Sequence, residues 1–160
     1  MTIHLQTTIG HVHLTVADLD RSLVFYRDIL WFEVTTTYGD SAVFLSAGGY
    51  HHHIGLNIWK GEGVPPSPPR TSGLYHFAIL LPSRLELAKV LQRLIDTNYS
   101  MDGASDHGVS EAFYLRDPDN IGVELYHDRP REQWKYSENG QVVMVTEALD
   151  LEDLLRELEW

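Results

Sequence analysis

The sequence of 160 residues contains no cysteine. This absence excludes disulfide bonds, thiolate metal sites and a cysteine nucleophile, and it fits a reducing compartment. Basic residues are also scarce, because 12 lysines and arginines face 23 aspartates and glutamates, which gives a formal net charge of −11. So acidic a chain lacks the basic field that attracts nucleic acid or an anionic membrane. We therefore expect neither of them as a partner.

Long hydrophobic runs are missing too. No apolar stretch approaches the length that spans a membrane, and the start lacks the basic and then hydrophobic order of a signal peptide. We therefore expect a cytoplasmic protein. The apolar fraction of 43% is nevertheless ordinary for a globular protein with a sizeable core. The length suits one compact domain or two small fused modules.

Strand and helix signals occur in the same order twice. Residues 9–60 begin with an alternating strand, continue with helical spacing after Asp18, and end with three further strand-like runs. Residues 73–128 repeat this order, and Ser83 with Glu86 forms a capping box before the helix. Four prolines in residues 61–72 predict a stiff linker. The sequence thus predicts an α+β fold in which residues 1–130 form two tandem βαβββ modules.

Residues 131–160 form an acidic tail. We expect a strand over residues 141–146 and a helix that begins at Asp150. The apolar positions of this helix imply that it docks on another surface; they are Leu151, Leu154, Leu155 and Leu158. That surface is either the body of the same chain or a second copy, so a homodimer is one of two arrangements that the sequence leaves open.

Three metal-competent side chains lie in strand-like runs. His11 and His76 occupy the same place in the first strand of each module, and Glu124 lies in the last strand of the second module. A single strand histidine is more often a surface or hydrogen-bonded residue, and a single glutamate there is usually solvated. Because these residues lie in equivalent places of a repeat, an interpretation as ordinary surface or core residues is weaker. Two imidazoles and one carboxylate are the ligands of an open mononuclear iron(II) site.

Over residues 9–128 the chain resembles the vicinal oxygen chelate superfamily, which includes glyoxalases, bleomycin-resistance proteins and extradiol dioxygenases. Three segments carry the resemblance: GHVHLTVADL at 10–19, YHFA at 75–78 and FYLRDPDNIGVELY at 113–126. It implies that the two modules form a curved half-barrel sheet around a metal cup, with His11, His76 and Glu124 as ligands. Iron(II) is the expected metal, and manganese, zinc and nickel are alternatives. Trp31 and Asn120 stand where the family usually has glycine.

Glyoxalase-like members of the superfamily use a fourth protein ligand, and the repeat identifies the residue at that position in this chain. It aligns Glu124 with Gly55, which has no side chain to bind a metal. An open position suits a bidentate substrate and dioxygen. His53 lies two residues before Gly55 and resembles the acid–base histidine of extradiol enzymes, whereas His52 is expected on the opposite face of the strand.

Further residues follow from the same resemblance. Tyr114 lies ten residues before Glu124, as does a tyrosine beside the ligands of extradiol enzymes, and His107 resembles a histidine that contacts the substrate oxygen. The residues expected to contact the substrate are His13, Asn57 and Trp59. His13 shares the strand face of His11 and is the competing ligand candidate.

The predicted function is that of an extradiol-type dioxygenase, which opens the ring of a catechol-like diol beside its hydroxyl groups with dioxygen. One alternative is another metalloenzyme of the superfamily, either a glyoxalase-type lyase or isomerase or an antibiotic-modifying transferase. The other is a non-catalytic small-molecule binding protein of the bleomycin-resistance type. That class lacks the metal triad, so the presence of all three ligands argues against it.

Overall fold

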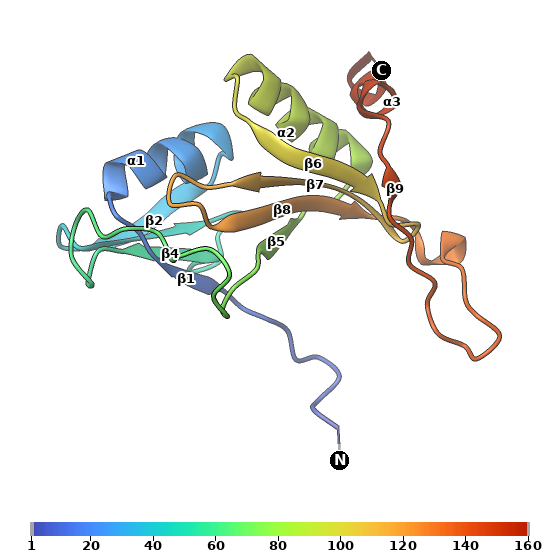
Figure 1. Cartoon of the computed structure of the whole chain (residues 1–160), viewed down its shortest axis with the longest axis horizontal. Coiled ribbons are helices and arrows are strands. Elements are labelled where there is room, and N and C mark those ends of the chain that lie inside the picture. The colour runs from blue at the N-terminus through green and yellow to red at the C-terminus, as the bar shows by residue number, and fades with distance from the viewer. Residues whose placement is uncertain (1, 160) are drawn as a thin grey trace. The chain divides into compact units, whose positions relative to one another are not determined.

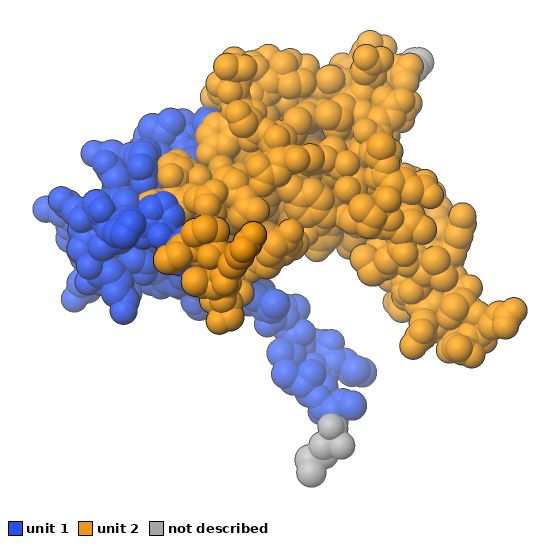
Figure 2. Space-filling view, viewed as in Figure 1, with its two compact units in different colours: residues 1–67 blue, residues 68–160 orange. Residues whose placement is uncertain are grey.

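The computed structural model describes residues 2–159. The chain divides into two compact units, unit 1 from Met1 to Ser67 and unit 2 from Pro68 to Trp160 (Figure 2). The boundary falls within residues 61–72, the segment predicted to be a linker. Each unit has its own sheet and its own buried core.

Unit 1 contains a single four-stranded sheet and one helical segment (Figure 1). The sheet has the order β1-β4-β3-β2; β1 runs parallel to β4, and the other neighbours are antiparallel. Its elements in chain order are β1 (Val12–Thr15), α1 (Leu19–Leu23), the π-helical turn η1 (Val24–Ile29), β2 (Glu33–Tyr38), β3 (Ala42–Ser46) and β4 (Ile54–Asn57). The predicted order of a strand, a helix and three strands is therefore confirmed.

Local chemistry explains where the helical segment of unit 1 begins and ends. The carboxylate of Asp18 accepts a hydrogen bond from the backbone N–H of Arg21 at 2.9 Å, which caps the first turn. Phe25 and Tyr26 are fully buried, so this segment covers the apolar face of the sheet. It ends at Trp31, which has a φ of +62°. That left-handed conformation is the one glycine usually supplies after a helix, as the family pattern predicts at this position.

Unit 2 repeats the topology of unit 1. Its elements are β5 (Phe77–Leu80), α2 (Arg84–Asp96), β6 (Met101–Asp106), β7 (Ser110–Arg116) and β8 (Gly122–Asp128). The sheet order is β5-β8-β7-β6-β9, and β5 runs parallel to β8. The hydroxyl of Ser83 accepts a hydrogen bond from the N–H of Glu86 at 3.2 Å, so the predicted cap of α2 is confirmed. The buried side chains are Leu87, Leu91, Leu94, Phe113, Leu115 and Leu125.

The tail belongs to unit 2. It contains the 3₁₀ turn η2 (Arg131–Gln133), β9 (Glu147–Ala148), α3 (Leu151–Leu155) and η3 (Arg156–Glu159). The prediction of a strand over residues 141–146 is wrong. The backbone partners change along this segment, because the N–H of Val143 binds the carbonyl of Lys135 and that of Val145 binds the carbonyl of His107. A continuous ladder to one neighbour therefore does not form.

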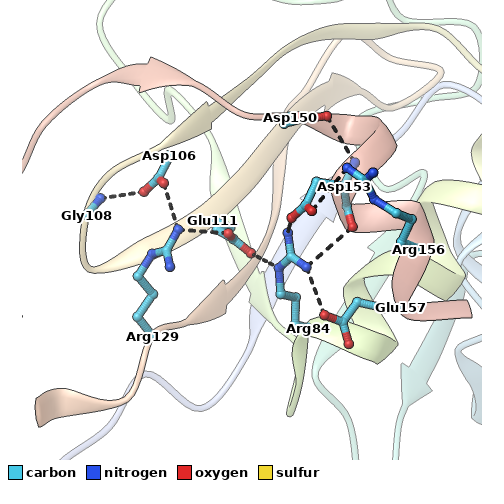
Figure 3. Close-up of polar contacts among 9 residues, drawn as sticks. All are labelled: Arg84, Asp106, Gly108, Glu111, Arg129, Asp150, Asp153, Arg156 and Glu157. Carbon is cyan, nitrogen blue, oxygen red and sulfur yellow. Dashed lines mark hydrogen bonds and ion pairs between the residues drawn. The ribbon is translucent and has the colours of Figure 1, made fainter. Parts of the chain in front are cut away.

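The tail helix docks on its own unit. Leu154 is fully buried, and α3 packs against α2. The guanidinium of Arg84 on α2 binds Asp153 at 2.7 Å and Glu157 at 2.8 Å (Figure 3). The carboxylate of Asp150 caps α3, as predicted, by accepting from the N–H of Asp153 at 3.0 Å. Packing within the unit thus buries Leu154, whereas Leu158 of the same stripe stays exposed.

Among residues 2–159, no helix has both the length and the apolar character that crossing a membrane requires.

Candidate metal centre

Two of the three predicted ligands meet in unit 2. His76 immediately precedes β5, and Glu124 lies in the adjacent strand β8, where it pairs with Ala78. The Nε2 atom of His76 lies 3.0 Å from Oε2 of Glu124, whose side chain is only 14% exposed. A carboxylate this far from water needs a cationic or hydrogen-bonding partner. One imidazole nitrogen and one carboxylate oxygen are therefore directed at the same point.

Gly122 makes this approach of the two strands sterically allowed. A Cβ atom at this position would overlap the carbonyl oxygen of Tyr75 and lie 2.9 Å from Cβ of His76. Backbone cannot yield as a flexible side-chain end can, so any larger residue must displace the segment that carries His76. The glycine was noted in the sequence only as part of a motif, and its steric role is visible only with both strands in place.

Replacing Gly122 by alanine should therefore move His76 and weaken metal binding. We expect the dissociation constant for iron(II), measured anaerobically by titration, to rise about 10- to 100-fold, the range seen when groups that orient metal ligands are lost. The matched control is Gly103→Ala in the same sheet, where an added Cβ meets nothing within 4 Å. Equal affinities in the two variants would contradict this account of Gly122.

Tyr114 and His107 extend the pair into a chain of four side chains. Tyr114 on β7 is the cross-strand partner of Glu124, and its hydroxyl donates to Oε1 of Glu124 at 3.2 Å. Burial, together with the charge of Glu124, raises the pKa of Tyr114 to about 12. The Nε2 atom of His107 lies 2.6 Å from the same hydroxyl. The four residues predicted in this module thus lie in one continuous set of contacts.

A cavity of about 420 Å³ opens beside this chain. It is bounded by Tyr75, His76, His107, Tyr114 and Leu115 among other residues of unit 2. Aromatic and apolar walls with a few convergent polar groups are typical of a site for a small organic ligand. The volume lies within the range of small-molecule pockets, and the cavity also has polar walls from Asp102, Arg116 and Thr146.

Unit 1 presents His11 in the place equivalent to His76. His11 immediately precedes β1, and the parallel register pairs His13 with Gly55 just as Ala78 pairs with Glu124. The predicted alignment of Gly55 with Glu124 is therefore confirmed by the pairing of the strands. The position that holds a carboxylate in unit 2 holds no side chain in unit 1.

The ring of His13 occupies the space above Gly55. A Cβ atom on Gly55 would lie 3.0 Å from this ring, so the glycine allows the imidazole to lie flat on the strand. The ring also contacts Phe44, with centroids 5.6 Å apart, and Trp59, with centroids 5.1 Å apart. Burial and the neighbouring His11 lower the pKa of His13. This neutral, aromatic surface matches the predicted contact with a flat substrate, which stays a prediction.

The other two residues predicted to contact the substrate are placed differently. Asn57 is 5% exposed, its amide donates to the carbonyl of Leu14 at 3.2 Å, and its oxygen accepts from the N–H of Trp59 at 3.1 Å. Asn57 therefore has a structural role that ties β1 to the end of β4. Trp59 is 58% exposed, and its indole N–H donates to Ser41. Contact of either residue with a substrate stays a prediction.

The side chains of His52 and His53 have different neighbours in unit 1. The backbone N–H of Ala47 donates to Nδ1 of His53, which leaves the proton of the neutral ring on Nε2. The ring of His52 lies 4.4 Å from that of His11 and 5.1 Å from that of Phe44. The prediction that His52 points to the opposite face is wrong, because β4 begins only at Ile54 and strand alternation does not reach residue 52. The contact of His52 with the proposed ligand His11 was thus missed by the sequence pattern.

Within residues 2–159, no three histidine, aspartate or glutamate side chains surround one point closely enough to hold an ion. Unit 2 by itself supplies an imidazole and a largely buried carboxylate 3.0 Å apart, and these are donor types that suit iron(II) and related divalent ions. The chemistry of this pair therefore fits a metal, while the third predicted ligand, His11, belongs to unit 1.

A βαβββ module used twice, with a histidine before the first strand of each copy and a glutamate in the last strand of the second, defines a class of metal-dependent and ligand-binding proteins. Residues 8–125 match the family model described as "Glyoxalase/Bleomycin resistance protein/Dioxygenase superfamily". The chain belongs to this superfamily.

Two relatives with known names are similar in sequence. The chain is 44% identical over 157 residues to catechol-2,3-dioxygenase of Bacillus subtilis (strain 168), covering 98% of this chain and 54% of the relative. It is 32% identical over 132 residues to biphenyl-2,3-diol 1,2-dioxygenase 3 of Rhodococcus globerulus, covering 80% of this chain and 68% of the relative. The chain thus spans about half the length of the Bacillus protein.

Solved structures share the fold. A glyoxalase/dioxygenase from Nostoc punctiforme superposes with a TM-score of 0.65 at 16% identity, covering 81% of this chain and 97% of the other. Lactoylglutathione lyase from Agrobacterium tumefaciens superposes with a TM-score of 0.60 at 20% identity, covering 78% and 96%. At these identities the likeness establishes the fold, which these proteins combine with different chemistries.

Proposed function

We propose that the protein is an iron(II)-dependent extradiol dioxygenase that opens the ring of a catechol-like diol. The single observation that carries this proposal is the chain of contacts from His76 through Glu124 and Tyr114 to His107, which lies beside a cavity of small-molecule size. The two named relatives, which are dioxygenases of catechol and of a biphenyl diol, support the same reaction class. Aromatic diol and dioxygen are the substrates proposed.

In this proposal His11, His76 and Glu124 hold the metal. A bound iron(II) would supply the Lewis-acid and redox chemistry that the reaction of a diol with dioxygen requires. Gly55 supplies no side-chain ligand at the fourth protein position, and the His13 ring lies over the strand there. Both atoms of dioxygen enter the product as the carbon–carbon bond beside the diol breaks, and no other reductant is needed.

The chain's own side chains hold and move protons. His53 keeps a proton on Nε2, because Nδ1 accepts from Ala47, and in this proposal it donates that proton to a reacting oxygen. Tyr114, with its raised pKa, stays protonated at neutral pH and keeps a hydroxyl proton available between Glu124 and His107. The aromatic group of His13, Phe44 and Trp59 provides a flat surface for the ring of the substrate.

The proposal is tested by loading the purified protein with iron(II) under anaerobic conditions and offering a panel of catechols in air. We expect turnover of at least one catechol with the iron(II) form, and none with the metal-free form. Loading with manganese, zinc or nickel in parallel identifies the active metal. Failure of every catechol, with iron demonstrably bound, would contradict the proposal.

The main alternative is a binding protein that sequesters a flat ligand without any chemistry. The exposed aromatic surface around His13 and Trp59 is the observation that favours it. A His76→Ala variant separates the two functions, because it removes a proposed metal ligand and leaves that surface in place. Undiminished ligand binding by the variant, together with absent turnover by the wild type, would establish the alternative.

A further inference from the structure

The acidic tail reaches the candidate site through one residue. The carbonyl of Val145 lies 2.8 Å from Nδ1 of His107, and the N–H of Val145 donates to the carbonyl of His107 at 3.1 Å. Two contacts from the same tail residue therefore hold both the backbone and the ring of His107. The opposite ring nitrogen, Nε2, lies 2.6 Å from the hydroxyl of Tyr114.

These contacts determine where the ring protons lie. A carbonyl oxygen only accepts hydrogen bonds, so Nδ1 of His107 must carry a proton to bind Val145. Which nitrogen of a histidine is protonated is set by the hydrogen bond that the other makes. With Nδ1–H committed to the tail, neutral His107 has its acceptor at Nε2, and the one hydroxyl proton of Tyr114 is donated either to this nitrogen or to Glu124. Any proton that the His107 ring gains or gives up is then exchanged through Nε2, which faces the hydroxyl of Tyr114. Tyr114 in turn contacts Glu124.

The tail is held in place by a network that continues to the turn containing His107. Arg84 binds Asp153 and Glu157 of the tail, and it shares Glu111 with Arg129 (Figure 3). Glu111 is only 4% exposed, so both guanidinium groups compensate a buried charge.

From Arg129 the network reaches the residue before His107. Arg129 binds Asp106 at 2.6 Å, and the other oxygen of Asp106 accepts from the N–H of Gly108 at 2.8 Å (Figure 3). Strand β9 adds backbone pairing to β6, with Asp106 opposite Glu147. Docking of the tail and the position of His107 are thus coupled.

We propose that one part of the tail, residues 141–159, is a positioning element of the site. In this element the Val145 carbonyl fixes His107 in the Nδ1–H tautomer, with Nε2 directed at Tyr114. The tautomer itself is a property of the folded chain. Its effect on turnover rests on the proposed function.

Long-range ¹H–¹⁵N NMR of the histidine rings in the metal-free full chain tests this directly. His107 is assigned by comparison with His107→Gln. In the wild type at neutral pH, Nδ1 should have the shift of a protonated nitrogen and Nε2 that of an unprotonated one. Val145→Pro removes the N–H that binds His107, and both shifts should move toward those of a free imidazole that exchanges tautomers. Val145→Ala keeps the backbone contacts and should retain the wild-type shifts.

A second variant tests the same inference if Val145→Pro disturbs folding. Asp153→Asn combined with Glu157→Gln weakens the docking of the tail on Arg84 and should move the same two shifts in the same direction. The matched control, Arg156→Gln, removes an exposed cation that binds only Asp153 in the tail and should leave them unchanged. Wild-type shifts for His107 in both undocked variants would overturn the inference, even if the protein turns over catechols.

Turnover gives a separate readout. If the proposed function holds, kcat in the undocked variants should fall about 10-fold, with little change in KM, because a group that orients another is lost. If no catechol is turned over by any form, the NMR result still decides the role of the tail. Failure of the inference and failure of the proposed function are therefore distinguishable.

Discussion

Replacing Glu124 by alanine abolishes metal binding at the candidate site. The side chain supplies the only carboxylate among the three proposed ligands, and His76 Nε2 lies 3.0 Å from it. Loss of a ligand should cost more than the roughly 10- to 100-fold in affinity that loss of an outer partner costs. We therefore expect a dissociation constant for iron(II) that is raised by more than about 100-fold, measured by anaerobic titration.

Two further variants make this result specific. Glu124→Gln keeps the shape of the side chain and an oxygen that accepts from Tyr114, so a loss of affinity in this variant reports the charge rather than packing. Glu138→Gln, in an exposed loop of the same unit, removes one carboxylate that is not among the proposed ligands and should bind iron(II) as the wild type does. Wild-type affinity in both Glu124 variants would exclude this residue as a ligand.

Replacing His53 by alanine leaves metal binding intact and removes most of the turnover. General acid–base groups typically contribute about 10²- to 10⁴-fold, so kcat for the best catechol should fall by that factor. Binding of iron(II) should change little, since Nδ1 of His53 faces Ala47 and the residue is not among the proposed ligands. Steady-state kinetics of the iron-loaded variant, normalised to measured iron content, provides the measurement.

The neighbouring histidines serve as comparisons for this variant. His52 lies against His11, whereas His51 is exposed. If His53 is the proton donor, His51→Ala should retain wild-type kcat. A variant His52→Ala that loses turnover, beside a His53→Ala that keeps it, would move the acid–base role to His52.

Much of the fold was predictable because local signals agreed with the tertiary structure. The capping residues Asp18, Ser83 and Asp150 each begin a helix in the structure, and the repeat of strand and helix signals predicted two βαβββ modules, each of which has its own sheet. The lack of a strand over residues 141–146 was not predictable, because it arises from backbone partners that change from Lys135 to His107 along the segment. Apolar alternation alone cannot reveal such a change of partner.

The site was predictable where the repeat fixed the register. The equivalence of His11 with His76, and of Gly55 with Glu124, follows from two identical strand pairings. Residues outside the regular strands were less predictable. His52 reaches the functional face because β4 starts two residues later, and Val145 reaches His107 through the path of the tail. Both contacts depend on loop geometry, which alternation does not describe.

The proposed reaction predicts one result that none of the competing functions predicts. A catechol turned over by the iron(II)-loaded protein under ¹⁸O₂ should give a ring-opened product that carries both labelled oxygen atoms, cleaved beside the diol rather than between its two hydroxyl carbons. Mass spectrometry of the product measures both the label and the position of cleavage. A product with no label from dioxygen, or a catechol recovered unchanged from protein with bound iron, would contradict the assignment of this protein as an extradiol dioxygenase.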